Sequence, residues 1–239
     1  MAENRELKRI RERLALQLPV RIHCREAADF EWTEMTRLTN VTPFGAAFTL
    51  TRPTEKGRLL HMTIPMPRQL RVFDHVEDQY RIWAIVRHLK SKTTDKGPAF
   101  EVGVAFIGKR APASYDVEPW KRYEISIDAA DKLARLDEMQ RSDGADQREH
   151  TRHHIAVDML VEMIDVKGAV VMSEQTVTED ISPHGATLFT TLDIPIGRFI
   201  RLTSAQYSTT AHAAIRSRTT GADGIPRIHV EFVDKQWPL

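Results

Sequence analysis

The sequence contains a single cysteine, Cys24, among its 239 residues. One thiol excludes an internal disulfide framework and a zinc site built from several cysteines. Long apolar runs are missing as well: no stretch of about 18 residues could span a bilayer, and the charged opening MAENRELKRIRERL lacks the apolar core of a secretory leader. We therefore expect a cytoplasmic protein without a membrane span.

An excess of charge of either sign is also absent. Lys and Arg number 34 and Asp and Glu number 33, which leaves a net charge of +1. Such a chain has no global basic field to attract nucleic acid nonspecifically, so a charged ligand would have to be bound by a local patch. The sequence also has no glycine-rich phosphate loop and no Ser-His-Asp set, and we expect a protein that is not an enzyme.

The chain does contain an internal repeat. NVTPFGAAF, residues 40–48, matches DISPHGATL, residues 180–188, position by position. Both are polar turns placed between two strand-like runs, and each has a glycine that permits a positive φ or a close approach of backbone. The two halves of the chain are therefore expected to fold alike.

An arginine pair with a four-residue interval precedes each turn. Arg9 and Arg13 lie before the first, and Arg148 and Arg152 before the second. Arg13 lies 27 residues before Asn40, and Arg152 lies 28 residues before Asp180. Two unrelated turns would not be expected to share this spacing, so each pair belongs to the repeat.

Short strand-like runs separated by turns fill both halves, at intervals of about ten residues. This pattern favours a mainly β fold with five or six strands per half, closed into two small antiparallel barrels in tandem. An insertion at residues 67–78 is expected to be an extended loop. The clearest runs are residues 59–66, 80–89, 100–107, 170–177, 186–190, 198–203, 210–216 and 228–233.

Between the halves, apolar residues recur every three or four positions, which predicts an amphipathic helix over residues 118–140. We expect this helix to cover the first barrel, with dimerisation as a coiled coil as the alternative. The breaker SDGADQ follows it at residues 142–147. The predicted domains are thus residues 1–117, a helical linker at 118–147, and residues 148–239.

The charged residues of the second half suit a guanine nucleotide. Arginine presents a planar fork of donors that fits phosphate oxygens and the O6 and N7 edge of guanine. Asp180 can accept hydrogen bonds from guanine N–H groups, and the hydroxyl of Ser182 can bond phosphate, sugar or base. The ligand would need both negative charge and a guanine edge.

An R-x-x-x-R pair followed about 30 residues later by [D/N]-x-S-x-x-G, at the front of a small β-barrel, resembles the PilZ domain family, whose members bind the bacterial second messenger cyclic di-GMP. The closing run IHVEFVD, residues 228–234, resembles the last strand of that family. The resemblance implies that the second half binds cyclic di-GMP, with arginines on its phosphates and guanines and the aspartate and serine on a guanine. The implied ligand residues are Arg148, Arg152, Asp180, Ser182 and Gly185.

The first half is a weaker copy of the motif, because Thr42 stands where the family has serine and its extra methyl group must fit beside the ligand. A second, weaker cyclic di-GMP site and a barrel kept for packing or partner contact both remain open for this half. The alternative for its opening segment is a short charged helix. The residues of the possible second site are Arg9, Arg13, Asn40, Thr42 and Gly45.

Other features favour simpler interpretations. His150, His153 and His154 lack acidic or cysteine partners at ligand spacing, so we expect no metal site. Cys24 follows His23, but neighbours on a strand point to opposite faces, so a buried thiol is expected. A barrel that binds single-stranded nucleic acid would need stacking aromatics in a basic groove, and aromatics are only 7% of the chain.

The function that these patterns favour is a bacterial cyclic di-GMP effector. The ligand is expected to order residues 142–152 and so reset the angle between the barrels, because a breaker lies directly beside the charged half of the site. The partner would belong to motility, secretion or polysaccharide machinery or to transcription, and a homodimer is possible in principle. A protein-interaction module that binds no ligand is the alternative.

Overall fold

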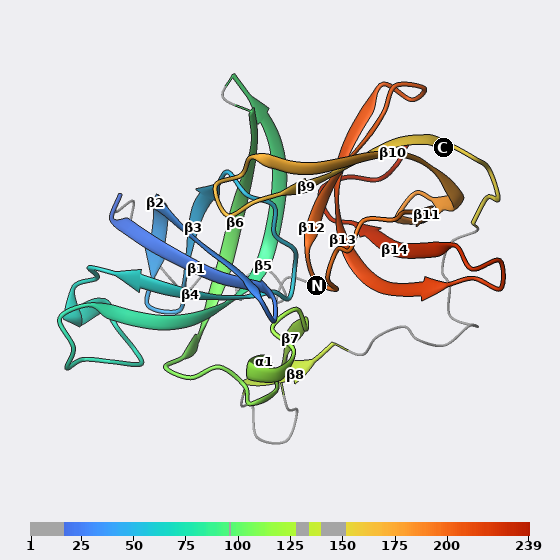
Figure 1. Cartoon of the computed structure of the whole chain (residues 1–239). Helices are drawn as coiled ribbons and strands as arrows, with labels where there is room; N and C mark the ends of the chain where they lie inside the picture. Colours follow the sequence, from blue (N-terminus) through green and yellow to red (C-terminus); the bar gives the residue numbers. More distant parts are fainter. Residues whose placement is uncertain (1–16, 96, 128–133, 140–151) are drawn as a thin grey trace, which may run out of the picture.

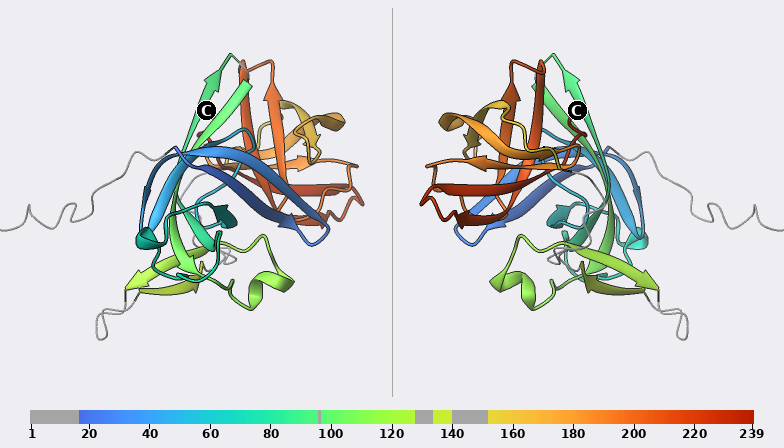
Figure 2. Two further views of the ribbon diagram at one scale, coloured as in Figure 1. Left: turned by 90° about the vertical axis from the view of Figure 1, so that its left-hand side faces the viewer. Right: turned by 90° about the vertical axis from the view of Figure 1, so that its right-hand side faces the viewer.

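The computed structural model describes residues 17–95, 97–127, 134–139 and 152–239. These residues form two closed antiparallel β-barrels of six strands each, which lie side by side (Figures 1 and 2). The prediction of two small barrels in tandem is confirmed. No helix in this part of the chain is long and apolar enough to cross a membrane.

The first barrel is ordered β1-β2-β3-β6-β5-β4 and closes between β4 and β1. The insertion before β5 carries one 3-10 turn, η1 (Arg68–Leu70), and is held by the buried Arg71, which donates to the carbonyl oxygens of Met66 and Asp78 at 2.8 and 2.9 Å. The strands are β1 (Pro19–Ala27), β2 (Phe30–Thr42), β3 (Gly45–Leu50), β4 (Leu59–Ile64), β5 (Tyr80–Thr94) and β6 (Gly97–Gly108).

The second barrel repeats this topology, with the order β9-β10-β11-β14-β13-β12 closed between β12 and β9. Each strand therefore has one counterpart in the first barrel, and the register assigns counterparts residue by residue. The strands are β9 (Asp158–Ile164), β10 (Val170–Ser182), β11 (Gly185–Phe189), β12 (Phe199–Ser204), β13 (Thr209–Thr220) and β14 (Pro226–Phe232).

Each barrel has its own core, built by strands that alternate inward apolar and outward polar side chains. In β1, for example, Val20, Ile22 and Cys24 are fully buried, while the residues between them face outward. Small side chains such as Ala186, Ala211 and Ala213 let the narrow second barrel close around its larger residues. Because each half buries its own core, both halves need the same alternation of apolar and polar residues along their strands.

The segment between the barrels differs from the prediction. Residues 118–140 were expected to be a helix, but the described part forms two antiparallel strands, β7 (Tyr123–Ile127) and β8 (Ala134–Glu138), after a single helical turn, α1 (Ser114–Val117). The helix prediction is wrong. The run YEISI also alternates apolar and polar residues, and pairing with β8 satisfies its backbone.

The β7-β8 sheet nevertheless covers the first barrel, as was expected of the helix (Figure 1). Tyr123 and Tyr115 are buried against Leu59 and Ile85 on the outside of that barrel. The coiled-coil alternative falls with the helix, because a two-stranded sheet presents no heptad seam.

A buried charged contact joins the two barrels. Arg58 is fully buried and donates to Glu55 at 2.6 Å and to the carbonyl oxygen of Gly197 in the second barrel at 3.3 Å. Glu55 also accepts from Arg216 of β13. Burial raises the pKa of the Glu55 carboxyl, but the charges of Arg216 and Arg58 outweigh it and lower the pKa to about 2.

A second buried carboxylate of the first barrel also contacts the second barrel. Glu26 of β1 accepts from the indole of Trp32 at 2.7 Å and from the backbone N–H of Phe199 at 3.2 Å, and it lies 3.3 Å from Arg198. Arg198 is the counterpart of Arg58, since each follows a glycine of positive φ at the start of the fourth strand of its barrel. The interface thus places equivalent arginines of the two barrels in buried ion pairs.

We predict that Glu55→Gln lowers the free energy of unfolding by about 3 kcal/mol at neutral pH, because it leaves Arg58 and Arg216 buried without their carboxylate. The pKa of Glu55 is depressed in the folded chain, so its contribution is present above about pH 4.5 and is lost as the pH falls towards 2. Urea unfolding of both proteins from pH 7 to 3 should therefore show the difference shrinking below about pH 4.5.

The matched control is Asp78→Asn, which removes the carboxylate from an ion pair whose aspartate is fully exposed. This variant should unfold like the wild type. A constant difference between wild type and Glu55→Gln over the whole pH range would contradict the assignment of the pH effect to Glu55.

Candidate functional site

The turn between β10 and β11 is closed by the side chain of Ser182. Its hydroxyl donates to the carbonyl oxygen of Gly185 at 3.2 Å and accepts from the backbone N–H of His184 at 3.4 Å. Thr42 makes the equivalent two bonds in the first barrel, both at 3.2 Å. Threonine therefore replaces serine in this turn without changing its hydrogen bonds.

Gly185 is required by a close approach of two backbones. A Cβ atom at this position would lie 2.3 Å from the carbonyl oxygen of Val230 in β14. Gly45 repeats the arrangement, with the oxygen of Val104 in β6 at the same 2.3 Å. Of the two roles that the sequence left open for this glycine, the close approach is the one found, and its neighbour is the last strand of the barrel in sequence.

A β-bulge precedes each turn at the same point of the repeat. The register of β10 against β11 shifts between Thr178 and Asp180, and that of β2 against β3 shifts between Leu38 and Asn40. Bulges re-aim the side chains beside them. Here the bulge sets Asp180 opposite Thr187 of β11, on the outside of the barrel.

Arg152 meets Asp180 in front of this turn. Its Nη1 donates to Oδ1 of Asp180 at 2.6 Å and to the hydroxyl of Thr187 at 3.0 Å. The lead-in is held by an antiparallel bridge, in which the backbones of His153 and Ile181 exchange bonds of 2.8 and 3.0 Å. The structure thus brings together two predicted site residues that lie 28 apart in sequence.

The other predicted arginines cannot be placed. Arg148, Arg9 and Arg13 lie outside the described residues. Of the three histidines considered for a metal, His150 also lies outside them, and the described part of the chain contains no cluster of three His, Cys, Asp or Glu that could hold an ion.

Cys24 is buried in the first core, and burial raises the pKa of its thiol to about 12. A thiol in that state is a poor nucleophile at neutral pH. This agrees with the expectation of a buried cysteine rather than a reactive pair with His23.

Two polar residues of this site, Thr187 and His229, were not predicted from the sequence. Thr187 is fully buried, and its hydroxyl lies 3.1 Å from both carboxylate oxygens of Asp180 and 3.1 Å from Nδ1 of His229 in β14. Nε2 of His229 lies 3.1 Å from the hydroxyl of Thr219. Aligning the two barrels strand by strand would have singled these residues out, since their counterparts are Ala47 and Gly103.

Arg152 and Asp180 together offer donors and acceptors at one place. Their side chains are 28% and 14% exposed, so a ligand can reach both. A ligand with an anionic group and a neighbouring pair of N–H donors would replace each partner of the ion pair with a matching group. A simple anion would satisfy only the arginine and leave the carboxylate without a cationic partner.

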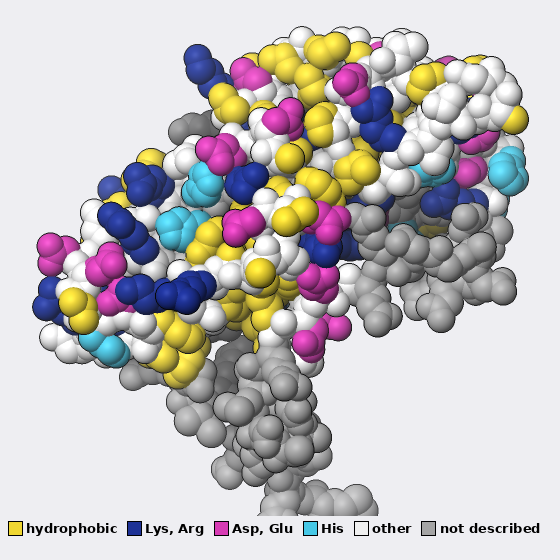
Figure 3. Space-filling view, turned by 60° about the horizontal axis from the view of Figure 1, so that its bottom comes forward, with side chains coloured by type: hydrophobic (Ala, Val, Ile, Leu, Met, Phe, Trp, Pro, Cys, Tyr) yellow, Lys and Arg dark blue, Asp and Glu magenta, His cyan; other side chains and the backbone are white. Residues whose placement is uncertain are grey.

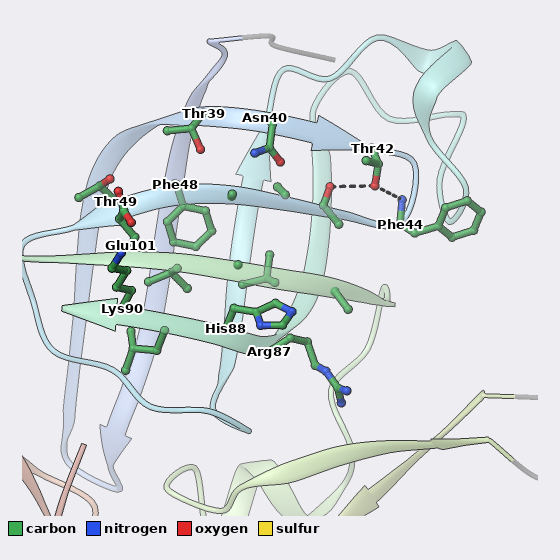
Figure 4. Close-up of a pocket in the computed structure, with 18 residues that line it drawn as sticks. Thr39, Asn40, Thr42, Phe44, Phe48, Thr49, Arg87, His88, Lys90 and Glu101 are labelled. Atoms are coloured by element: carbon green, nitrogen blue, oxygen red, sulfur yellow. Dashed lines mark hydrogen bonds between the residues drawn. The ribbon is translucent and has the colours of Figure 1, made fainter. Parts of the chain in front are cut away.

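The same face of the first barrel is hollowed. Here Ala47 and Gly103 stand in place of Thr187 and His229, and a hollow of about 790 Å³ opens over β2, β3, β6 and β5. Figure 4 shows Thr39 and Asn40 along one edge and Arg87 and His88 along the other. The two barrels thus share a backbone at this face but fill it differently.

Charges of both signs are interspersed on the face of the molecule drawn in Figure 3, with apolar side chains between them. A broad basic surface is not seen on that face. This distribution agrees with the balanced composition, so a charged ligand would have to be bound by local groups such as Arg152 and Asp180.

No protein-family model matches the chain, and no curated protein matches it. Among solved structures, the chain is similar to the inhibitor of motility MotI/DgrA of Bacillus subtilis, with 11% identity over 93% of this chain and 90% of that one and a TM-score of 0.31. It is also similar to PlzA of Borreliella burgdorferi in complex with c-di-GMP, with 9% identity, coverage of 95% and 89%, and a TM-score of 0.30.

A third similar structure is YcgR of Escherichia coli in complex with c-di-GMP, with 12% identity, coverage of 91% of this chain and 76% of that one, and a TM-score of 0.29. At these identities and TM-scores the similarities do not assign a ligand to this chain. The assignment depends on the chain's own residues.

We predict that Gly185→Ala destabilises the protein by about 2 kcal/mol, because the new methyl group meets backbone that cannot move aside cheaply. Gly103→Ala is the control, since its Cβ would meet only the His88 side chain at 3.3 Å. Urea unfolding should show a clear loss for the first variant and less than about 1 kcal/mol for the second. Equal losses would contradict this account of the motif glycine.

Proposed function

We propose that the chain is a cyclic di-GMP-binding effector of the PilZ type, with its ligand site on the second barrel. The observation that supports this proposal is the ion pair of Arg152 with Asp180 at the motif turn. Arg148 and Arg152 would bind the phosphates and guanine edges of the ligand, and Asp180 would accept from a guanine. Ser182 and Gly185 would contribute by shaping the turn that presents Asp180.

The chemistry of the ligand fits the groups at this site. Cyclic di-GMP carries phosphates, which suit the arginine, and guanines, whose ring and exocyclic N–H groups suit a carboxylate that only accepts. When such a dinucleotide separates Arg152 from Asp180, its phosphate can therefore replace the carboxylate as the partner of Arg152, and its guanine N–H groups can replace the guanidinium as the partner of Asp180. The function is binding and regulation, with no catalytic step assigned to any residue.

A second, weaker site on the first barrel is part of the proposal. Asn40, Thr42 and Gly45 line the hollow of about 790 Å³, which has the volume of a ligand pocket. Arg9 and Arg13 would approach it from the lead-in. The alternative for this barrel is a surface for a protein partner of the motility, secretion or polysaccharide machinery, and the ligand stoichiometry decides between the two.

Isothermal titration of cyclic di-GMP into the wild type should show saturable binding that is weakened by about tenfold to a hundredfold in Arg152→Ala and in Asp180→Ala, because each removes a charge-assisted contact. Arg81→Ala, which changes an exposed arginine of β5, should bind like the wild type. If Arg13→Ala lowers the stoichiometry, the first barrel holds a second ligand. Absence of binding in the wild type would refute the proposed function.

The effector part of the proposal is a change in the angle between the barrels, transmitted through residues 142–152 when Arg148 and Arg152 engage the ligand. Such a change must break buried contacts, among them the bond from Arg58 to Gly197. Binding energy spent on these contacts would lower the apparent affinity. We therefore predict different small-angle scattering profiles with and without cyclic di-GMP, and superimposable profiles at saturation would contradict the rearrangement.

A further inference from the structure

The hydroxyl of Thr187 is the common neighbour of three polar side chains of the second-barrel site. It lies within 3.1 Å of Arg152, Asp180 and His229, and the residue is fully buried. A fully buried hydroxyl satisfies its one hydrogen and two lone pairs with the groups packed around it. The hydrogen bonds can therefore be assigned by counting.

Arginine only donates, and the carboxylate paired with it only accepts. The hydrogen of Thr187 must then go to Asp180, and one of its lone pairs accepts from Arg152. The remaining lone pair faces Nδ1 of His229 at 3.1 Å, so Nδ1 must carry the hydrogen of that bond. The protein thus selects the Nδ1–H form of the imidazole.

The other ring nitrogen completes the chain of bonds. In the neutral imidazole with hydrogen on Nδ1, Nε2 is an acceptor, and the hydroxyl of Thr219 lies 3.1 Å away to donate to it. Three groups then donate in one direction, Thr219 to His229, His229 to Thr187, and Thr187 to Asp180, whose carboxylate only accepts. We call Thr219, His229 and Thr187 the relay.

The first barrel provides an internal comparison. The counterparts of Thr187 and His229 are Ala47 and Gly103, whose side chains cannot form hydrogen bonds, and the counterpart of Asp180 is Asn40. The turn, the bulge and the close glycine contact are the same in both barrels. The relay is therefore not needed to build the turn, and its place behind Asp180 points to the site.

We propose that Thr187 and His229 are positioning residues of the second-barrel site, which hold the Asp180 carboxylate and the Arg152 guanidinium in fixed orientations for the ligand. This role rests on the proposed function. A carboxylate that is hydrogen-bonded on its barrel side keeps its other lone pairs directed at the N–H groups of a ligand. The conformational entropy lost on binding is then smaller. Without the relay, Asp180 and Arg152 would both lose a partner that orients them.

The first test reads the relay directly in the ligand-free chain. Nitrogen-15 spectra of the histidine rings, recorded at a pH where His229 is neutral and assigned with His229→Asn, should show the Nδ1–H form. Thr187→Val has nearly the same shape but lacks the hydroxyl, so the preference for this form should be lost. A wild type in which His229 carries its hydrogen on Nε2 would overturn the relay.

The second test reads the consequence for binding by titrating cyclic di-GMP. Thr187→Val should bind about tenfold more weakly, because Asp180 and Arg152 each lose one buried hydrogen bond. Thr187→Ser keeps the hydroxyl and should stay within about threefold of the wild type, and His229→Asn, which keeps a donor near Nδ1, should bind better than His229→Leu. Thermal unfolding verifies that the compared variants are equally folded.

Thr203→Val in β12 is the control for replacing a strand threonine by valine, because its hydroxyl contacts Thr210 away from the site, and this variant should bind cyclic di-GMP like the wild type. Wild-type affinity in folded Thr187→Val would overturn the positioning role and leave the proposed function standing. A wild type that binds no cyclic di-GMP would overturn both, even if the ring spectra show the Nδ1–H form.

Discussion

Each barrel depends on a close backbone contact between the glycine of the motif turn and the sixth strand. In both barrels of this chain the third strand pairs with the sixth, and the glycine that begins the third strand lies close to a carbonyl oxygen of the sixth. Only glycine fits there, and a small hydroxylated residue three positions earlier ties the turn together. The bulge before the turn then decides which side chain faces outward at its entrance.

This constraint explains why the motif is duplicated although the two barrels carry different side chains around it. Gly45 and Gly185, and Thr42 with Ser182, build the same turn in both barrels of this chain. The side chains that differ between the two barrels beside the turn are Asp180, Thr187 and His229, whose counterparts are Asn40, Ala47 and Gly103. The sequence motif therefore contains two kinds of residue: those that shape the turn and those whose side chains the turn presents on the outside of the barrel.

Much of the fold followed from the sequence because it depends on short-range patterns. Alternation with period two, turn residues at regular intervals and the internal repeat predicted two barrels. The helix prediction failed at residues 118–140 because Trp120, Tyr123 and Ile127 fit helical spacing while Tyr123, Ile125 and Ile127 fit alternation, and tertiary packing on the first barrel decided between the two.

Contacts that depend on strand register or on the packing of one barrel against the other could not be predicted from sequence patterns. The meeting of Arg152 with Asp180 was predicted because both belong to the repeat. Thr187 and His229 were missed because their proximity depends on the register of β10, β11 and β14, which the bulge resets. The buried interface was not foreseen either, since Arg58 and Gly197 are 139 residues apart and nothing local marks an arginine that is fully buried.

That interface also bears on how such a protein can evolve. Arg58 and Arg216 meet at Glu55, and Glu26 binds the backbone of Phe199 beside Arg198, so each barrel contributes charges that the other compensates. Exchange of one barrel for a homologous one that lacks these residues would leave uncompensated charges in the buried interface. The two halves are similar as folds, but they are not interchangeable modules, and recombination can move them only as a pair.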